Sequence, residues 1–433
     1  MSTRVVITGI GAVTPLGVGA ETLHERAVEG LSGLNDENEN GLGGKVGRCL
    51  DFDVKNPLSR REMRRMDRYT QLAVAAADEA IAQAGWGGGL PCDARRITCY
   101  IGTAIGGLDT LETQHLVMHT EGAEEVSPLT VPMMMANAAP AHISMRHGLH
   151  GETTAIVTAC SSGAQAIVAG VRSILLGEAD AAVVGGAEAG TTRFTRAIFN
   201  AAGAISPDGN STPFDEERNG FNLGEGAGIL VLESAENARA RGAEILGEIA
   251  GYGLSSDAHH ITAPNPDGMY AAYALNRALE TAGATPEQVS YVNAHGTGTE
   301  LNDTTEVNVL RQALGDALED IPVSSTKSAI GHLFGAAGAV ETIATVSAVG
   351  PVGTVAQAAV AAGYSTEVAQ RLQVDIERII ARYPAGKERS ALIPMLHLIQ
   401  SVDGYVSPAG IALCAARLGL ERAEVSAVAT FYS

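Results

Sequence analysis

Three residues of the sequence carry side chains suited to acyl transfer, and each lies at the end of an apolar run. Cys160 stands in GETTAIVTACSSGAQAIVAG, His295 in SYVNAHGTGTELND and His332 in VSSTKSAIGHLFGAAGA. A cysteine thiolate attacks thioesters, and imidazole N–H groups stabilise the oxyanion that such reactions form. Each residue alone is more often a packed or structural residue, so it is their combination that indicates a catalytic site.

Each of these residues is expected where a strand meets a turn or helix. The β-branched run 153–158 predicts a buried strand and the alanine-rich run after it predicts a helix, which places Cys160 at the turn between them. The positive end of that helix should favour the Cys160 thiolate. His295 closes a second predicted strand, and Lys327 and His332 lie on a third such connection. A cationic Lys327 would keep the His332 ring neutral, as a hydrogen-bond donor needs.

Strand-like and helical runs alternate over most of the chain. We expect strands at 4–11, 97–104, 153–159, 180–188 and 226–234, and helices at 68–84 and 164–176. Such alternation predicts an α/β fold in which helices are layered on a sheet. A second series, with helices at 269–282 and 304–314 and a strand at 290–296, looks like a shorter version of the first.

The composition narrows the class of protein. With 433 residues and 45% hydrophobic content, the chain can form two or three domains with sizeable cores. The net charge of −20 argues against nucleic-acid binding and against a basic membrane anchor. The five cysteines are scattered without a CxxC pair, so neither a disulfide framework nor a zinc site is expected.

Two apolar stretches could be mistaken for export or membrane signals. The N-terminal run MSTRVVITGIGAVTPLG has strand character and ends in turn residues, unlike a signal peptide. Residues 329–363 contain only two titratable side chains, Glu341 and His332, yet their alanines and glycines predict a buried helix followed by a loop. We therefore expect a cytoplasmic protein that binds neither membrane nor nucleic acid.

Four stretches together resemble the β-ketoacyl-acyl-carrier-protein synthases of the decarboxylating, elongating type (synthase II-like). They are TACSSG, TPFDEERNGFNLGEGAG, NAHGTGT and KSAIGHLFGAAG, and the resemblance covers about residues 1–348. It implies the thiolase fold, an α/β fold of two similar halves packed in five α-β-α-β-α layers, normally as a homodimer. The nucleophile half is expected at 1–249, and an incomplete half with the histidine pair at 250–348.

The resemblance also implies roles for individual residues. Cys160 would accept the acyl chain from a carrier thioester, and His295 and His332 would act on the malonyl thioester with support from Lys327. Two polar residues near the site are expected to be structural: Asp303 and Glu306. The reaction, an acyl transfer followed by decarboxylative condensation with a malonyl carrier protein, needs no metal and no other cofactor.

Residue types separate this family from others that share its fold. A thiolase uses a second cysteine as base, but the one later cysteine, Cys414, lies outside the matching region. The chain-length partner of polyketide systems lacks the nucleophile, whereas Cys160 is present. Fatty-acid and polyketide synthesis both stay open, because the acyl-pocket candidates Phe199 and Met133 do not fix the acyl chain. Methionines such as Met133 are more often core or dimer-interface residues.

An acidic carrier protein needs a local positive surface on this acidic chain. The segment LSRREMRRMDRY supplies five arginines at helical spacing. The plain alternative is a solvated helix whose arginines pair with Glu62 and Asp67. Because synthases of this family use basic residues in this segment, we expect three residues to dock the carrier: Arg61, Arg64 and Arg65.

The chain changes character after about residue 348. An amphipathic helix follows, whose apolar stripe consists of Leu372, Ile376, Ile379, Ile380 and Tyr383. Further helices are expected at 392–398, after 407 and at 421–431. This helical tail, 349–433, looks like the N-terminal helical part of the [2Fe–2S]-binding subunit of NADH-quinone oxidoreductase. That family holds its cluster with four cysteines beyond such a region, so Cys414 alone implies no iron–sulfur or NADH chemistry.

The family's C-terminal portion has no counterpart after residue 348. In the family, that portion carries a glycine-rich loop with the second oxyanion donor and a phenylalanine gate. Losing one donor of such a pair costs on the order of a hundredfold in rate. The favoured function is a 3-oxoacyl-[acyl-carrier-protein] synthase, and the alternative is a catalytically impaired scaffold whose helical tail binds a respiratory-complex partner.

Overall fold

The computed structural model of the protein describes residues 3–37, 44–55, 57–349, 364, 366–382, 391–403 and 407–418. Contacts within the chain divide it into two compact units, Met1–Val349 and Gly350–Ser433. The boundary expected between residues 249 and 250 falls within the first unit and stays a prediction.

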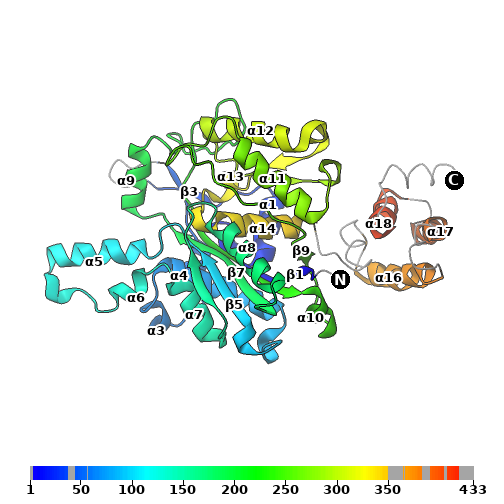
Figure 1. The fold of residues 1–433 in the computed structure, drawn as a ribbon, viewed down its shortest axis with the longest axis horizontal. Helices are drawn as coiled ribbons and strands as arrows, with labels where there is room; N and C mark the ends of the chain where they lie inside the picture. Colours follow the sequence, from blue (N-terminus) through cyan, green and yellow to red (C-terminus); the bar gives the residue numbers. More distant parts are fainter. Residues whose placement is uncertain are drawn as a thin grey trace. The chain divides into compact units, whose positions relative to one another are not determined.

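A mixed sheet of seven described strands runs through the first unit (Figure 1). The strands are β1 Val5–Thr14, β2 Gly17–Val18, β5 Ile97–Gly102, β6 Thr153–Ile156, β7 Ala181–Ala189, β8 Glu225–Ser234 and β9 Gly247–Glu248. Their order is β2-β1-β8-β7-β5-β6, with β9 paired to β1. β5, β6 and β7 run parallel, whereas β8 is antiparallel to both β1 and β7. All five strands expected in the first series are present.

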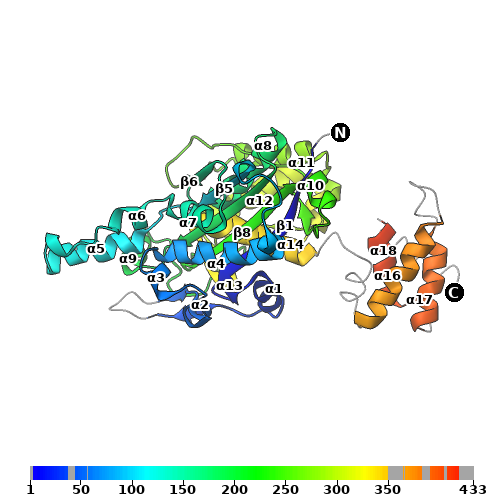
Figure 2. The same ribbon diagram turned by 90° about the horizontal axis from the view of Figure 1, so that it is seen from below.

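Helices cover both faces of this sheet, and each face has its own apolar core. The covering helices are α1 Ala20–Val28, α4 Arg68–Gln83, α7 Ala138–His147, α8 Ser162–Leu175 and α14 Ala337–Val349. Because side chains alternate along a strand, Val183 and Val231 pack with α4 and α7, whereas Val184 and Leu230 pack with α1, α8 and α14 (Figure 2). Burial on both faces explains why these strands are apolar throughout.

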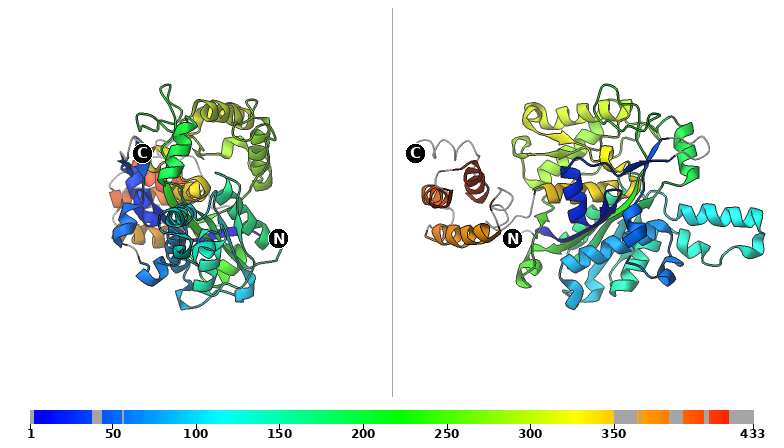
Figure 3. Two further views of the ribbon diagram at one scale, coloured as in Figure 1. Left: turned by 90° about the vertical axis from the view of Figure 1, so that its left-hand side faces the viewer. Right: turned by 180° about the vertical axis from the view of Figure 1, so that it is seen from behind.

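A second, smaller sheet lies beyond α8 and α14. It consists of the parallel strands β10 Val292–Asn293 and β11 Val323–Ser324, and it is covered by α11 Met269–Ala282 and α12 Glu300–Leu314. Leu279, Leu310 and Leu314 form the apolar contact between these helices and the strands. The right-hand view of Figure 3 shows the yellow-green helices on the outer side. The layers are therefore helix, sheet, helix, sheet, helix.

Shorter elements complete the first unit. They are β3 Leu34–Asp36, β4 Lys45–Gly47, α2 Leu50–Lys55, α3 Arg60–Met63, α5 Leu108–Thr120, α6 Thr130–Met134, α9 Arg193–Ala201, α10 Ala235–Ala240 and α13 Lys327–Ile330. Of these, α5 and α6 project away from the large sheet (Figures 1 and 2). None of the described helices combines the length and the hydropathy that a membrane span requires.

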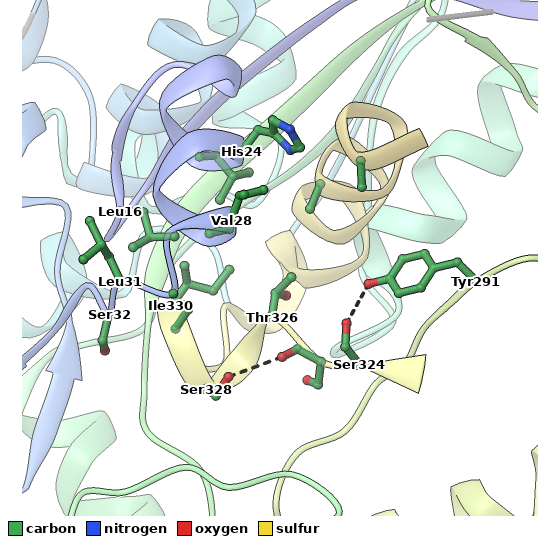
Figure 4. A pocket seen from close by; sticks show the side chains of 17 residues that line it. Leu16, His24, Val28, Leu31, Ser32, Tyr291, Ser324, Thr326, Ser328 and Ile330 are labelled. Carbon is green, nitrogen blue, oxygen red and sulfur yellow. Dashed lines mark hydrogen bonds between the residues drawn. The ribbon is translucent and has the colours of Figure 1, made fainter. Parts of the chain in front are cut away.

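A groove of about 530 Å³ opens between α1, α14 and the end of β11 (Figure 4). Leu16, Val28 and Ile330 give it an apolar lining, and Ser324 and Ser328 lie on its polar side. None of the four residues predicted to be catalytic, Cys160, His295, Lys327 and His332, lines it. The groove is therefore separate from the candidate site.

The second unit contains three described helices: α16 Thr366–Ile380, α17 Leu392–Asp403 and α18 Pro408–Leu418. They share one apolar core, in which Leu372 and Ile376 from α16 meet Met395 and Leu413. The predicted apolar stripe of the first tail helix is confirmed for its described members. Tyr383 and the helix expected at 421–431 lie outside the described residues.

Candidate active site

Cys160 lies in a tight turn between β6 and α8. Ala159 before it has a left-handed backbone (φ 51°), which is uncommon for a residue with a Cβ. The Ser162 side chain holds the turn, because its hydroxyl accepts the Thr158 N–H (2.8 Å) and donates to the Ala159 carbonyl (2.6 Å). The Sγ atom of Cys160 is thereby presented 3.0 Å from Nε2 of His332.

The resting state of this cysteine differs from the expectation. We expected the helix terminus to favour the thiolate, but burial raises the pKa of Cys160, and the nearby Lys327 charge offsets this rise only in part. The expected direction of the pKa shift is wrong for two reasons. α8 begins at Ser162, so Cys160 precedes its first turn, and burial of the thiol disfavours its charged form. Cys160 therefore rests as a thiol.

His332 follows α13 and is fixed in one tautomer. Its Nδ1 atom accepts the backbone N–H of Phe334 (3.2 Å), so the ring proton resides on Nε2, which faces Cys160. The Phe334 ring stacks on the imidazole, with centroids 4.8 Å apart. Burial, with a further contribution from the Lys327 charge, holds the pKa of His332 well below its usual value. The ring is a neutral N–H donor.

His295 follows β10, and its ring centroid lies 5.3 Å from that of His332. The Glu306 carboxylate accepts the N–H groups of His295 (2.7 Å) and Gly296 (2.8 Å), which fixes this turn. Burial and the Lys327 charge also hold the pKa of His295 well below its usual value. The second ring is therefore neutral as well.

The donor atoms of Cys160, His295 and His332 all lie within 4.8 Å of one another. That spacing brings together the three residues singled out from the sequence, on connections that follow three different strands. It would also suit a single metal ion, and the absence of a metal requirement stays a prediction.

Lys327 is buried beside the two histidines and is 1% exposed. Its ammonium group donates to the His295 carbonyl (2.5 Å) and forms an ion pair with Glu341 on α14. The sequence reasoning did not assign Glu341 to the site. The available signal was its position as the one carboxylate in the stretch 329–363.

Asp303 stabilises the neighbouring turns and does not reach the cluster of donor atoms. Its carboxylate is buried and accepts the N–H groups of Phe214 (2.7 Å) and Gly298 (3.1 Å). Together with Glu306, it holds the Gly-Thr-Gly segment after His295. Asp303 and Glu306 thus make contacts of the structural kind that the resemblance implies for them.

The two acyl-pocket candidates differ in position. Phe199 stacks on Phe334 (centroids 5.2 Å apart) and belongs to the apolar cluster that includes Cys160 and Phe221. Met133 lies on α6, where its backbone packs against Gly107, and it is not a member of that cluster. Phe199 is therefore the candidate that borders the site within this chain.

Four of the five arginines in this segment, among them Arg61, Arg64 and Arg65, are exposed, whereas Arg68 is half-buried and pairs with Asp53 and Glu225. The two carboxylates considered as partners for these arginines have other roles. Glu62 completes the cap of α3 with Ser59 and pairs with Arg146, and Asp67 caps α4. Among the described residues, neither carboxylate pairs with the arginines proposed for docking, namely Arg61, Arg64 and Arg65. Their charges face solvent, as a docking surface requires.

The layered fold and this cluster define a class: acyltransferases of the thiolase fold that carry one cysteine beside two histidines. Residues 2–238 match the family described as "Beta-ketoacyl synthase, N-terminal domain", and residues 246–355 match "Beta-ketoacyl synthase, C-terminal domain". The chain belongs to the β-ketoacyl synthase family.

Curated relatives agree with this assignment. The 3-oxoacyl-[acyl-carrier-protein] synthase 2 of Staphylococcus aureus (strain COL) is 41% identical over 349 residues, which cover 78% of this chain and 83% of that protein. The synthase 2 of Synechocystis sp. is 43% identical over 350 residues, with the same coverage. The family predicted from the four sequence stretches is confirmed.

Solved structures agree on the fold. A β-ketoacyl synthase from Burkholderia phymatum superimposes with a TM-score of 0.73 at 32% identity, covering 80% of this chain and 86% of that chain. A type II polyketide ketosynthase in complex with its acyl-carrier protein gives a TM-score of 0.72 at 32% identity and the same coverage. The predicted thiolase fold is confirmed.

The tail matches a different family. Residues 376–433 match "Thioredoxin-like [2Fe-2S] ferredoxin", which confirms the predicted resemblance. A [2Fe–2S] cluster needs four ligands, usually cysteine thiolates. Cys414 is the one cysteine of this stretch; it packs in the apolar core of the three helices, and burial raises its pKa to about 12. The residues present do not fit such a cluster.

Proposed function

We propose that the protein is a 3-oxoacyl-[acyl-carrier-protein] synthase in which Cys160 carries the growing acyl chain. The observation that carries this proposal is the 3.0 Å approach of His332 Nε2 to Cys160 Sγ, with the neutral His295 ring beside it. The family assignment and the curated relatives support the same chemistry. The cytoplasmic location expected from the sequence is part of this proposal.

In the first step, the acyl group moves from a carrier thioester to Cys160. The sulfur attacks the thioester carbonyl, the carbon–sulfur bond to the carrier breaks, and the thiol proton leaves with the carrier as its free thiol. His332 donates its Nε2–H toward the reacting sulfur, which stabilises negative charge there. One thioester replaces another, so the step is close to isoenergetic.

In the second step, a malonyl thioester loses carbon dioxide beside the acylated cysteine. The electrons of the broken carbon–carbon bond pass to the thioester oxygen, giving an enolate. The neutral rings of His295 and His332 stabilise this oxyanion as donors. The enolate carbon attacks the acyl–Cys160 carbonyl, and the released thiolate takes up one proton. Lys327 contributes by keeping both rings uncharged.

The acyl donor in this proposal is an acyl carrier protein that docks on Arg61, Arg64 and Arg65. Support comes from their exposure on an otherwise acidic chain and from the ketosynthase neighbour solved with its acyl-carrier protein. Fatty-acid and polyketide carriers both fit this charge pattern. Phe199 borders the space where the acyl chain would begin.

A homodimer is the second part of the proposal. β6 is the last of the described strands of the large sheet, and no other described strand pairs with its outer edge. Beside this edge Val157 is 54% exposed, and the projecting helices α5 and α6 expose Leu116 and Val131. An open edge flanked by apolar side chains is typical of a surface covered by a second copy. Light scattering of the purified chain tests this part.

Labelling of Cys160 tests the proposed function. We expect a radiolabelled acyl-carrier thioester to acylate the protein, Cys160→Ala to abolish the label, and Cys92→Ala to leave it unchanged. Cys92 is a fitting control because it is a partly exposed free thiol outside the cluster. Labelling that survives in Cys160→Ala would sink the proposal.

The tail supports a second candidate function. Its match to a respiratory-type family at 376–433 favours the scaffold alternative, in which the helices bind a protein partner. Absence of Cys160 labelling, together with capture of a flavin-bearing respiratory subunit by the full chain, would favour that candidate over the synthase.

A further inference from the structure

Glu188 is a buried carboxylate that no step of the proposed reaction uses. It is the last residue but one of β7, and its side chain is fully shielded from solvent (0% exposed). Its described partners are a hydroxyl and backbone N–H groups, not a basic side chain. The carboxylate accepts the Thr103 hydroxyl (3.0 Å), the Ala104 N–H (2.6 Å) and the Gly335 N–H (3.1 Å).

These partners come from two separate turns. Thr103 and Ala104 follow β5, whereas Gly335 lies three residues after His332. The two turns are in close contact, since a Cβ on Gly335 would come within 2.4 Å of the Ala104 nitrogen. Glu188 therefore fastens the segment after His332 to the end of β5.

Phe334 connects this clamp to the catalytic ring. Its backbone is left-handed (φ 44°), a strained conformation for a non-glycine residue that surrounding contacts must hold. In this conformation its N–H donates to His332 Nδ1. The next N–H along the chain, that of Gly335, is the one bound by Glu188. Release of that bond would free Phe334 to relax and withdraw its N–H from the imidazole.

We propose that Glu188 is a positioning residue, which acts through Gly335 and Phe334 to hold His332 in the tautomer whose Nε2–H points at the reacting sulfur and oxyanion. The inference deepens the proposed function and rests on it for the part that His332 plays. A purely space-filling Glu188 would leave the tautomer unchanged when its charge is removed.

The clamp is also sensitive to pH. Burial raises the pKa of Glu188 to about 7, and the bonds from Ala104, Thr103 and Gly335 offset this rise only in part. Protonation replaces an acceptor with a donor, which weakens the bonds to N–H groups. The Glu188 charge in turn helps to raise the pKa values of Tyr69 on α4 and of Cys160. The His332 tautomer should therefore become mixed as the pH falls through about 7.

The test is nitrogen-15 NMR of the full chain labelled at histidine, with Glu188→Gln as the variant. Wild type at pH 8 should show His332 protonated on Nε2. Glu188→Gln should populate the other tautomer and lower kcat for condensation by roughly tenfold to a hundredfold, with KM for the carrier unchanged.

Glu233→Gln is the matched control. Glu233 is also a buried sheet carboxylate, bonded to Thr8 and Arg241, but it pairs with the opposite end of β7, roughly 23 Å from Glu188. This variant should be less stable, yet keep the His332 tautomer and kcat.

An unchanged His332 tautomer in folded Glu188→Gln overturns the proposal, whatever the activity. Failure of the proposed function shows separately, as absence of Cys160 labelling. If Glu188→Gln does not fold, Thr103→Val removes one donor from the same carboxylate. Because the loss of a donor raises the pKa of Glu188, the pH at which the His332 tautomers become mixed should then move upward. If that pH stayed the same, the proposal would likewise be overturned.

Discussion

The Nε2 atom of His332 lies 3.0 Å from the Sγ atom of Cys160, and the other ring nitrogen accepts a backbone N–H. A histidine held in this way cannot take the cysteine proton at Nε2 without becoming charged, which burial and Lys327 oppose. His332 is therefore arranged to donate a hydrogen bond, first toward sulfur and then toward an oxyanion.

Replacing His332 should affect decarboxylation more than acyl transfer. His332→Ala removes one of two donors to the enolate oxygen, which typically costs about 10²- to 10³-fold in rate. Carbon dioxide release from a malonyl-carrier thioester measures the effect. His24→Ala, on the groove outside the site, serves as the control and should retain the full rate. Equal rates in the two variants would contradict the donor role.

Alkylation of Cys160 should show that the resting group is a thiol. Because burial raises its pKa, inactivation by iodoacetamide should keep accelerating as the pH rises past 9. Lys327→Met removes the charge that favours the thiolate, so its profile should move to still higher pH. A rate that levels off below pH 8 would mean that the thiolate is already formed at rest.

The catalytic cluster was predictable because its members follow strand ends. Parallel strands bring their carboxyl ends to one edge of a sheet, so local patterns are enough to pair His295 with His332 after β10 and β11. Local patterns also place Cys160 at a strand end, but its approach to the histidines depends on how the large sheet packs against the small one. The direction of the Cys160 pKa shift could not be predicted in this way, because it depends on burial by segments that are distant in the sequence. Local reasoning sees the helix terminus, but not the desolvation that outweighs it.

The supporting carboxylates were harder to predict for a related reason. Glu341 pairs with Lys327 across two elements, and Glu188 joins turns from β5 and from the segment after His332. In the sequence both appear only as single charges within apolar runs. Such a charge signals a buried partner, but the fold is needed to identify that partner.

The two neutral histidines should make the protein sensitive to acid. Their folded-state pKa values lie well below the unfolded value of 6.5, so below pH 6.5 the unfolded chain binds more protons and the free energy of unfolding falls. Each ring contributes a slope of up to about 1.4 kcal/mol per pH unit.

His295→Asn should remove one ring's share of that slope between pH 5 and 6, measured by urea unfolding. Glu188 contributes in the opposite direction. Its raised pKa lowers stability as the pH rises from 4.5 to about 7, so only the difference between variant and wild type isolates the histidine. If the free energy of unfolding of variant and wild type showed the same dependence on pH, His295 would not be buried as a neutral ring.

Reversing the charge of the α3 arginines should weaken carrier docking without touching the chemistry. In the triple variant Arg61→Glu, Arg64→Glu and Arg65→Glu, KM for the acyl carrier protein should rise at least tenfold, because a basic patch steers an acidic partner. The kcat/KM for a small acyl thioester, which needs no docking surface, should stay as in wild type. Arg239→Glu places the same reversal on an exposed arginine of α10 and should leave both values unchanged.

Salt provides a second measurement of the same docking surface. The difference in KM for the acyl carrier protein between wild type and the triple variant should shrink as salt rises from 50 to 500 mM, because salt screens exposed charges. A KM that does not change with salt would point to an apolar docking surface instead.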